Sequence, residues 1–334
     1  MVSGSWPPEP CGVGHYASRL SDSLADVGID LVRFGAGQAL SMRNLHQVVG
    51  QARSLAADII HLQYPTMAYG RSLAPPLFAM LARSPVVVTL HEFSSFRFYR
   101  LPWFLPYTLF VDALVFTTAL ERDAFRRRLH HLPTVNEIIP IGSNIPAGPV
   151  QPRKPRSVCY FGLIMPDKGL EQFIELMQRL SGKNFTFTVI GSIPHKWIAY
   201  GTEIVSKIRA LGGQMVMNAV SDVVALQLRQ HTYIYLPFPD GATDKRGSLL
   251  AAVVNGLTVL APLTDISRPP ITEYVVHAGT PHEAASLLLE FEDGRRNWKA
   301  GARFAVVSDY EWHTIAQRHQ RVYETVLARR KDLS

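Results

Sequence analysis

The sequence predicts an α/β protein built from two doubly wound domains, each with a parallel sheet covered by helices on both faces. Three observations lead to this prediction. Short apolar runs rich in β-branched and aromatic residues alternate with longer segments of helical period. The runs are continuously apolar, which is typical of strands buried on both faces. The alternation occurs twice, on either side of a segment rich in proline and cations, residues 143–157.

Each half of the chain contains five predicted strands. In the first half these are IDLVRF (29–34), DIIHLQ (58–63), VVVTLH (86–91), DALVFTT (112–118) and NEIIPI (136–141). In the second half they are SVCYFG (157–162), FTFTVIG (185–191), QMVMN (214–218), YIYLP (233–237) and LTVLA (257–261). The intervening segments predict helices at 15–27, 44–56, 119–130, 169–181, 201–211, 222–230 and 248–255.

The last segment, 309–330, has apolar residues at helical spacing and predicts one long helix. We therefore expect an N-terminal domain over residues 1–145 and a C-terminal domain over 157–308. Residues 309–334 are expected to add the terminal helix.

Composition narrows the classes of function. The chain has 334 residues, of which 47% are apolar and 18% charged, so two ordinary domains are expected. Cys11 and Cys159 are the only cysteines, which gives neither a disulfide framework nor a zinc pattern and suits a reducing compartment. The net charge of +7 favours anionic partners, namely nucleotides, phosphates or acidic lipid surfaces. Without a zinc-finger, basic-zipper or RNA-binding pattern, nucleic acid is not expected.

Neither the N-terminus nor the longest apolar stretch has the pattern of an export signal or a membrane span. The start, MVSGSWPPEP, does not have the pattern of a signal peptide. It leaves only a stub before the first turn, so either the first strand is very short or the true start lies upstream. The longest apolar stretch, 101–116, contains two prolines and Asp112 and is shorter than the roughly 20 residues that span a bilayer.

Ligands of parallel sheets bind beyond the carboxyl ends of the strands, and the loops there carry cations and glycines. Lys168 stands where a strand ending at Gly162 leads into a helix. A cation at this end opposes the helix dipole, so a bound phosphate would explain it. The alternative is a solvated lysine.

A second such position is the segment DKRGS, 244–248, which leads directly into an apolar helix. Arg246 offers a planar set of donors suited to a diphosphate. Gly247, Ser248 and Leu249 would open the helix and leave backbone N–H groups accessible. The segment predicts a phosphate or diphosphate cradle, and the alternative is a surface loop with cations turned to water.

The first half has two further candidates. Gly12 and Gly14 precede a helix that begins near His15 and Tyr16, an arrangement that lets the backbone approach a ligand. This turn has an ordinary structural alternative without a ligand.

His91 and Glu92 end a strand, where a histidine would position a sugar hydroxyl or a phosphate oxygen. The alternative is a histidine bonded to neighbouring groups. The two glycine-containing turns, at 12–14 and 162–169, do not have the spacing of a dinucleotide site. The sequence contains no hydrolase triad, HExxH or P-loop signature.

The layout resembles the GT-B-fold glycosyltransferases of family four, which use nucleotide-sugar donors. The resemblance covers nearly the whole chain and rests on the order of its motifs. They are PPEPCGVGHYASRL, ADIIHLQYP, VVVTLHEF, FTTALERDAF, IPIGSNIP, YFGLIMPDKGLEQFIELM, FTVIGS, VSDVVALQLRQHTYIYLPF, NGLTVLAP and YEWHTIAQRHQRVYETVL.

The resemblance implies two Rossmann-like domains facing a cleft, with the donor in the second, the acceptor in the first, and the last helix crossing back onto the first. It maps a donor-phosphate contact onto Lys168, places the glycine turn at Gly12 and Gly14 against the donor phosphates, and turns His91 toward the reacting sugar. Together with the loop residues described above, this gives His91, Lys168 and Arg246 as the expected catalytic residues. The expected donor-binding residues are Gly12, Gly14, Gly162, Lys168, Arg246, Gly247, Ser248 and Leu249, and the expected acceptor-binding residues are His15, Tyr16, Tyr64, His91 and Glu92.

Two positions depart from the family pattern. The arginine that usually follows the glycine at 162 is Leu163, and the second of two usual glutamates is Ala251, with Thr243 near the first. The carboxylate that usually contacts the donor ribose is therefore missing, and Arg246 would supply the cation that Leu163 lacks.

The resemblance implies a cytoplasmic hexosyltransferase of polysaccharide biosynthesis that is retaining and needs neither metal nor cofactor. Its partners would be a nucleotide-diphosphate sugar and a glycan, lipid-linked or small-molecule acceptor. Two other functions stay open, a non-catalytic GT-B subunit that binds a glycan or nucleotide, and a nucleotide-sugar epimerase.

One further segment bears on location. FSSFRFYRLPWFLPYTL, 93–109, interleaves aromatics with Arg97 and Arg100, a composition that suits peripheral contact with the inner membrane face. The alternative, favoured for most of these aromatics, is that they pack in the core of the first domain.

Overall fold

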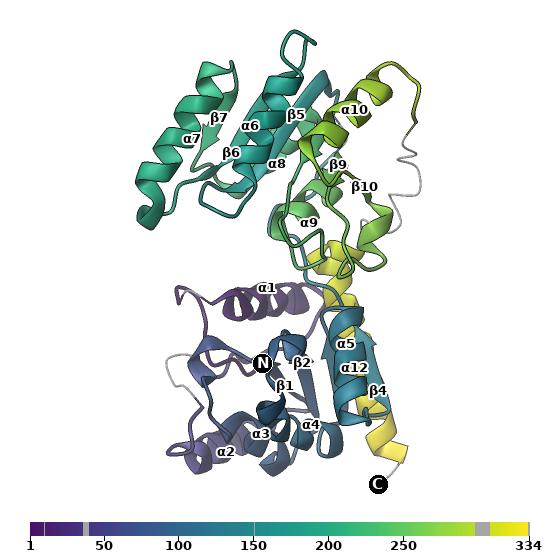
Figure 1. The fold of residues 1–334 in the computed structure, drawn as a ribbon. Coiled ribbons are helices and arrows are strands. Elements are labelled where there is room, and N and C mark those ends of the chain that lie inside the picture. The colour runs from purple at the N-terminus through teal and green to yellow at the C-terminus, as the bar shows by residue number, and fades with distance from the viewer. Residues whose placement is uncertain (10, 36–39, 150, 298–307, 333–334) are drawn as a thin grey trace. The chain divides into compact units, whose positions relative to one another are not determined.

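The computed structural model describes residues 1–334 except 10, 36–39, 150, 298–307 and 333–334 (Figure 1). The chain forms two compact units. Unit 1 contains Met1–Gly142 and Trp312–Ser334, and unit 2 contains Ser143–Glu311. The predicted pair of parallel-sheet α/β domains is confirmed, with four strands in one sheet and six in the other among the described residues.

Unit 1 contains a parallel sheet in the order β1-β2-β3-β4. Its strands are β1 (Ile60–Tyr64), β2 (Val86–Leu90), β3 (Ala113–Phe116) and β4 (Val135–Ile138). Its α-helices are α1 (Gly12–Asp26), α2 (Leu45–Ser54), α3 (Ala74–Leu81), α4 (Leu105–Leu109), α5 (Ala119–Leu129) and α12 (Trp312–Asp332). Short 3-10 helices follow β1 and β2, namely η1 (Met67–Tyr69), η2 (Phe93–Ser95) and η3 (Phe98–Trp103).

Side-chain alternation along β2 and β3 builds two cores, one on each face of this sheet. Val88 and Phe116 point to the side of α2 to α5, where they join a cluster that contains Phe78 and Phe125. Alternate residues such as Val87 join a second cluster. Its other members include Leu20 and Leu24 of α1, and Ile315, Ala316, Val322 and Val326 of α12. The C-terminal helix therefore completes one face of unit 1.

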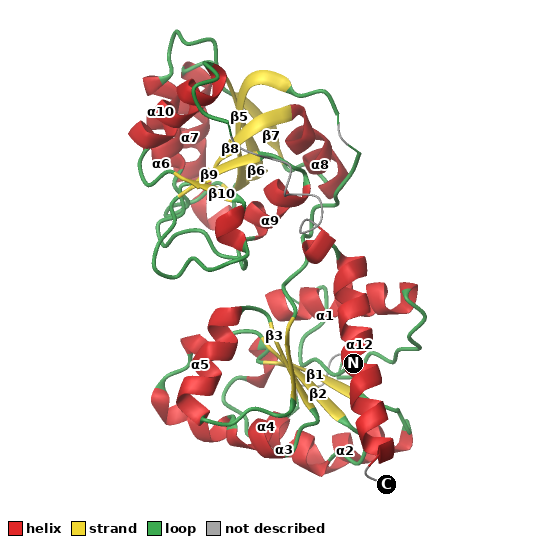
Figure 2. Ribbon diagram, turned by 90° about the vertical axis from the view of Figure 1, so that its right-hand side faces the viewer, coloured by secondary structure: helices red, strands yellow, loops and turns green. Residues whose placement is uncertain are grey.

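Unit 2 contains a six-stranded parallel sheet in the order β10-β9-β8-β5-β6-β7. Its strands are β5 (Lys154–Leu163), β6 (Thr186–Ser192), β7 (Gln214–Met217), β8 (His231–Tyr235), β9 (Thr258–Ala261) and β10 (Val275–His277). Its helices are α6 (Leu170–Arg179), α7 (Ile198–Ala210), α8 (Ser221–Gln230), α9 (Gly247–Val254) and α10 (Pro281–Glu292), with η4 (His195–Trp197), η5 (Ile271–Glu273) and η7 (Ser308–Tyr310). Figure 2 shows α6, α7 and α10 on one face of this sheet and α8 and α9 on the other.

The strand order of unit 2 fixes where a ligand would bind. The chain enters the sheet at β5, adds β6 and β7 on one side, and then crosses to add β8, β9 and β10 on the other. The direction of winding reverses between β5 and β8. In doubly wound sheets the crevice lies at this reversal, beyond the carboxyl ends of the strands.

Five elements differ from the sequence expectations. The expected strand at 29–34 is reduced to one bridge, between Phe34 and Val2, and Val2 also bridges to Leu62. The N-terminal stub thus takes the place beside β1, and residues 29–33 stay irregular. Strand β10 and helix α10 were not predicted, and neither were the proline-containing helices α3 and α4.

Candidate functional site

A cavity in unit 2 lies at the reversal point between β5 and β8. Its volume is about 670 Å³. Its walls come from the carboxyl ends of four strands and from the starts of two helices. The lining residues include Gly162 of β5, Gly191 and Ser192 of β6, Asn218 after β7, Phe238 and Pro239 after β8, and Lys168, Lys245, Arg246, Gly247 and Ser248.

Two glycines without side chains, one on β5 and one on β6, line this cavity where the two strands lie side by side. Gly162 and Gly191 are paired neighbours in the sheet. A Cβ atom on Gly191 would overlap the carbonyl oxygen of Gly162, so only glycine fits there. Gly169 has φ of +78°, and a Cβ on it would overlap the carbonyl oxygen of Pro237. This glycine lets the first turn of α6 approach the loop that follows β8.

Lys168 is held at the rim of the cavity by the loop between β5 and α6. The hydroxyl of Tyr160 donates to the carbonyl oxygen of Lys168 over 3.1 Å. Burial raises the pKa of Tyr160, which keeps the hydroxyl protonated as a donor. Lys168 directly precedes Gly169, the N-cap of α6. The lysine and the unpaired N–H groups of the first helical turn therefore lie on the same side of the cavity.

Arg246 is the N-cap residue of α9, and two neighbours position its guanidinium. One nitrogen lies 3.1 Å from a carboxylate oxygen of Asp240, and the guanidinium carbon lies 5.0 Å from the centre of the Phe238 ring. The side chain remains 26% exposed. Because the Phe238 ring and Asp240 hold only part of its five N–H donors, Arg246 can bind an anion without reorienting.

The cavity is thus cationic and lies beside the open N-termini of α6 and α9. Lys168, Lys245 and Arg246 line it, against one lining carboxylate, Asp167. Free backbone N–H groups at helix N-termini bind phosphate well. The arrangement suits a diphosphate with an organic group beside it.

The structure brings together most of the predicted donor residues of unit 2. Gly162, Lys168, Arg246, Gly247 and Ser248 line one cavity. Leu249 does not, because its side chain is fully buried in the core of unit 2. Asp240 and Phe238, which position Arg246, were not predicted as site residues. The turn sequence Phe-Pro-Asp-Gly after a strand was the available signal.

The predicted residues of unit 1 divide into a surface group and a buried group. Gly12, His15 and Glu92 are exposed. Gly14 is buried against the carbonyl of Ser5, where a Cβ would approach to 2.7 Å. Tyr64 is 1% exposed and packs among Tyr69, Phe104 and Tyr107.

His91 and Tyr16 are buried together. Their ring centroids lie 4.8 Å apart in an edge-on arrangement. The Nε2 atom of His91 lies 2.9 Å from Oε1 of Gln63, so Nε2 carries the hydrogen and donates. The hydroxyl oxygen of Tyr16 also lies 3.5 Å from Nε2 of His319 in α12.

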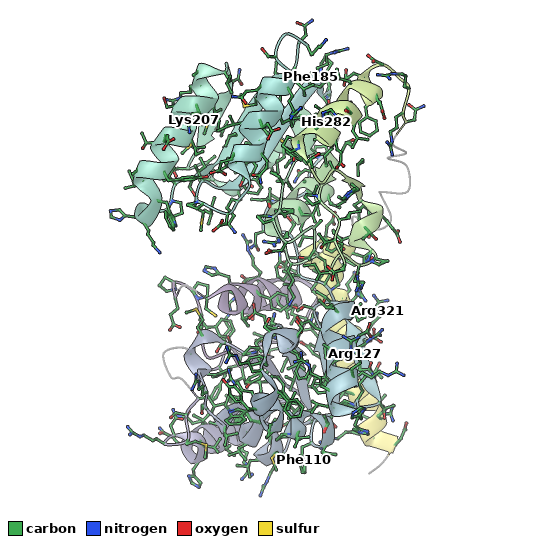
Figure 3. The ribbon with its side chains drawn as sticks, in the orientation of Figure 1. Phe110, Arg127, Phe185, Lys207, His282 and Arg321 are labelled. Carbon is green, nitrogen blue, oxygen red and sulfur yellow. The ribbon has the colours of Figure 1, made fainter. Side chains whose placement is uncertain are left out.

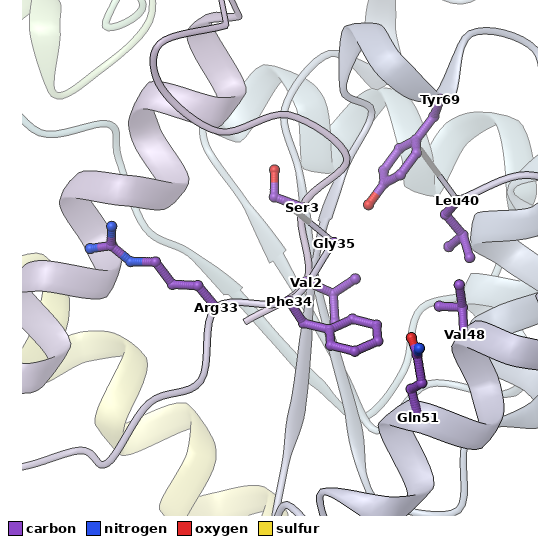
Figure 4. A pocket seen from close by; sticks show the side chains of 9 residues that line it. All are labelled: Val2, Ser3, Arg33, Phe34, Gly35, Leu40, Val48, Gln51 and Tyr69. Carbon is purple, nitrogen blue, oxygen red and sulfur yellow. The ribbon is translucent and has the colours of Figure 1, made fainter. Parts of the chain in front are cut away.

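A smaller cavity of about 220 Å³ lies in unit 1 beside the N-terminal stub (Figure 4). It is lined by Val2, Ser3, Arg33, Phe34, Gly35, Leu40, Val48, Gln51 and Tyr69. In Figure 4 the Tyr69 hydroxyl points toward the segment Val2–Ser3. None of the predicted acceptor residues lines this cavity.

No family model matches the sequence, and no curated protein matches it either. Solved structures do resemble the fold. The structure of HepE from Anabaena in complex with UDP and glucose superposes with a TM-score of 0.63 at 15% identity, covering 97% of this chain and 98% of that one. A glycosyltransferase from Rickettsia africae superposes with a TM-score of 0.70 at 11% identity, covering 98% and 97%.

The apo form of the lipopolysaccharide outer core galactosyltransferase WaaB gives a TM-score of 0.65 at 11% identity, covering 97% and 98%. These structural neighbours are GT-B glycosyltransferases, and the likeness extends over nearly the whole chain. The GT-B fold expected from the order of the sequence motifs is therefore confirmed.

Proposed function

We propose that this chain binds a uridine diphosphate sugar in the cavity of unit 2 and transfers the sugar to a hydroxyl acceptor. The observation that carries the proposal is the convergence of Lys168, Arg246 and the N-termini of α6 and α9 on one cavity at the reversal point of the sheet. The solved HepE complex with UDP, of the same fold, supports UDP as the nucleotide.

The chemistry assigned to these groups is stabilisation of the leaving diphosphate. In the transfer the bond from the anomeric carbon to the β-phosphate oxygen breaks, and a bond from that carbon to the acceptor oxygen forms. Negative charge grows on the diphosphate as the bond breaks. Lys168, Arg246 and the helix N–H groups are already oriented and so stabilise this charge. The proton of the acceptor hydroxyl passes to a phosphate oxygen of the donor.

The roles of the remaining predicted residues are also proposals. His91 is proposed to position the reacting sugar, and the retaining, metal-independent course stays a prediction. Glu92 and His15 are the exposed candidates for the acceptor. The acceptor is proposed to be a glycan, a lipid-linked glycan or a small-molecule hydroxyl.

The test is to incubate the protein with UDP-glucose, UDP-galactose or UDP-N-acetylglucosamine and to measure the rate of UDP release. The free sugar is measured alongside as the product of donor hydrolysis. We expect turnover of at least one donor. Lys168→Ala and Arg246→Ala should each lower the rate of UDP release, whereas Lys183→Ala on the exposed surface of unit 2 should not. Equal rates in all four proteins would contradict the proposal.

One observation favours a second candidate, a nucleotide-binding subunit without transferase activity. Helix α9 contains no carboxylate, and Ala251, where related enzymes are expected to place one, is fully buried. Binding of UDP with no turnover of any donor, alone or with acceptors, would select this candidate.

A further inference from the structure

Unit 1 exposes a group of large apolar side chains on neighbouring elements. We name this group the apolar ledge and define it as Met67, Phe98, Tyr99, Leu105, Leu109 and Phe110. Phe98 is 83% exposed, Met67 74% and Leu109 68%. Leu105 and Leu109 lie one turn apart on α4, and Phe110 follows directly. Figure 3 shows Phe110 at the edge of unit 1.

The ledge is held rigidly, because the same segments also supply the core of unit 1. Leu101, Phe104 and Tyr107 alternate with the exposed residues and are 7% exposed or less. Phe104 packs edge-on against Phe93, with ring centroids 4.8 Å apart. The sequence expectation that these aromatics pack in the core therefore holds for one face of the segment 93–109, and the other face stays exposed.

Two hydrogen bonds join η3 to the loop that carries Met67. Arg100 donates to the carbonyl oxygen of Gly70 over 3.0 Å, and Trp103 Nε1 donates to that of Arg71 over 3.1 Å. Arg100 also lies 4.5 Å from the centre of the Phe96 ring. The exposed side chains thus come from short helices and their flanking residues, which these hydrogen bonds and the buried aromatics attach to the core of unit 1.

The charged side chains in the segment that carries the ledge are mostly positive. Between residues 65 and 110 the chain contains four arginines, at 71, 83, 97 and 100, and Glu92 is the only acidic residue. Arg71, Arg83 and Arg97 are exposed. Unit 1 as a whole has 17 arginines and lysines against 12 acidic residues. Apolar tips interleaved with arginine, with almost no acids, match a surface that has anionic headgroups over an acyl layer.

We propose that the apolar ledge docks unit 1 on an anionic lipid bilayer as a peripheral contact. Phe98, Leu109 and Phe110 enter the interface between headgroups and acyl chains, and Arg71 and Arg97 contact the phosphates. No helix in the described part of the chain is both long and apolar enough to cross a bilayer. Docking concerns unit 1 alone and does not depend on the donor proposed for unit 2.

The test is cosedimentation of the full chain with vesicles of phosphatidylcholine alone and of phosphatidylcholine with 30% phosphatidylglycerol. We expect the protein to partition about tenfold more strongly into the anionic vesicles, with most binding lost in high salt. The double variant Phe98→Ser with Leu109→Ser should lower partition by about tenfold or more. Arg97→Glu should weaken binding to anionic vesicles about tenfold.

Matched controls come from unit 2. Val220, 69% exposed, and Ile198, 52% exposed, give the double variant Val220→Ser with Ile198→Ser. It should bind vesicles like the wild type, and circular dichroism should show all variants folded. Absence of wild-type binding to anionic vesicles overturns the proposal, as does equal binding by the ledge variant. A third outcome also overturns the membrane proposal. If the wild type is a dimer that does not bind vesicles, and the ledge variant is a monomer, the apolar ledge is a protein interface.

Discussion

The Nδ1 atom of His61 in β1 lies 2.6 Å from the hydroxyl of Tyr323 in α12, across 262 residues of sequence. The other ring nitrogen of His61 lies 2.7 Å from Oγ1 of Thr89 on β2, and Gln63 extends the chain of contacts to His91. Both His61 and Tyr323 are buried. A buried polar network therefore joins the C-terminal helix to the sheet of unit 1.

Tyr323→Phe should lower the free energy of unfolding by about 1–3 kcal/mol, because it leaves a buried nitrogen of His61 without its partner. Urea denaturation measures this change. Tyr310→Phe in unit 2 is the matched control, since the buried Tyr310 hydroxyl has no hydrogen-bond partner among the described residues. That variant should be neutral or stabilising. Equal losses of unfolding free energy in the two variants would show that the contact between Tyr323 and His61 does not stabilise the protein.

The same network predicts that acid destabilises unit 1. Burial lowers the pKa of His319 to about 4, and burial, then nearby His319, the N-terminal amine and His91, lower that of His61 well below its usual value. Both histidines are neutral when folded and take up protons near pH 6.5 when unfolded. Stability is thus fully present above pH 6.5 and is lost as the pH falls toward 4.

For His319 alone the loss between pH 6.5 and 4 should approach about 3 kcal/mol. Urea titrations at several pH values measure it. The variant His319→Gln should flatten the dependence on pH, even if it also lowers stability. His15→Gln, at an exposed histidine, should leave the slope unchanged. A His319→Gln protein with the wild-type slope would contradict the assignment.

Gly169→Ala should destabilise the protein more than Gly182→Ala does. Both glycines have positive φ, +78° and +72°, so both variants carry the left-handed backbone cost of about 1 kcal/mol. Only Gly169 also lies against the carbonyl oxygen of Pro237, whereas a Cβ on Gly182 meets no atom within 4 Å. Thermal unfolding measures the difference, and a loss no larger at Gly169 would mean that this close approach is dispensable.

The parallel α/β architecture could be predicted because buried parallel strands are continuously apolar, as in the segments that became β2, β5 and β8. The expected strand at 29–34 was wrong, because among the described residues only Val2 bridges to it, at Phe34. Helix α10 could have been found. Thr280 and Glu283 form a capping box at its start, and the sequence shows that spacing.

The candidate site was predictable where a local rule applied. Lys168 and Arg246 stand at strand-to-helix junctions, and the reversal of winding between β5 and β8 brings these junctions together. The network around His61 was not predictable. It depends on which side chains the folded chain brings together, and residues 61 and 323 share no local pattern.

Calorimetric titration of UDP into the wild type and into Lys168→Ala tests the diphosphate site directly. We expect binding by the wild type and about 10- to 100-fold weaker binding by the variant, as for loss of a charge-assisted contact of roughly 1.5–3 kcal/mol. No heat of binding with millimolar UDP, or equal affinity in the two proteins, would contradict a diphosphate site at Lys168.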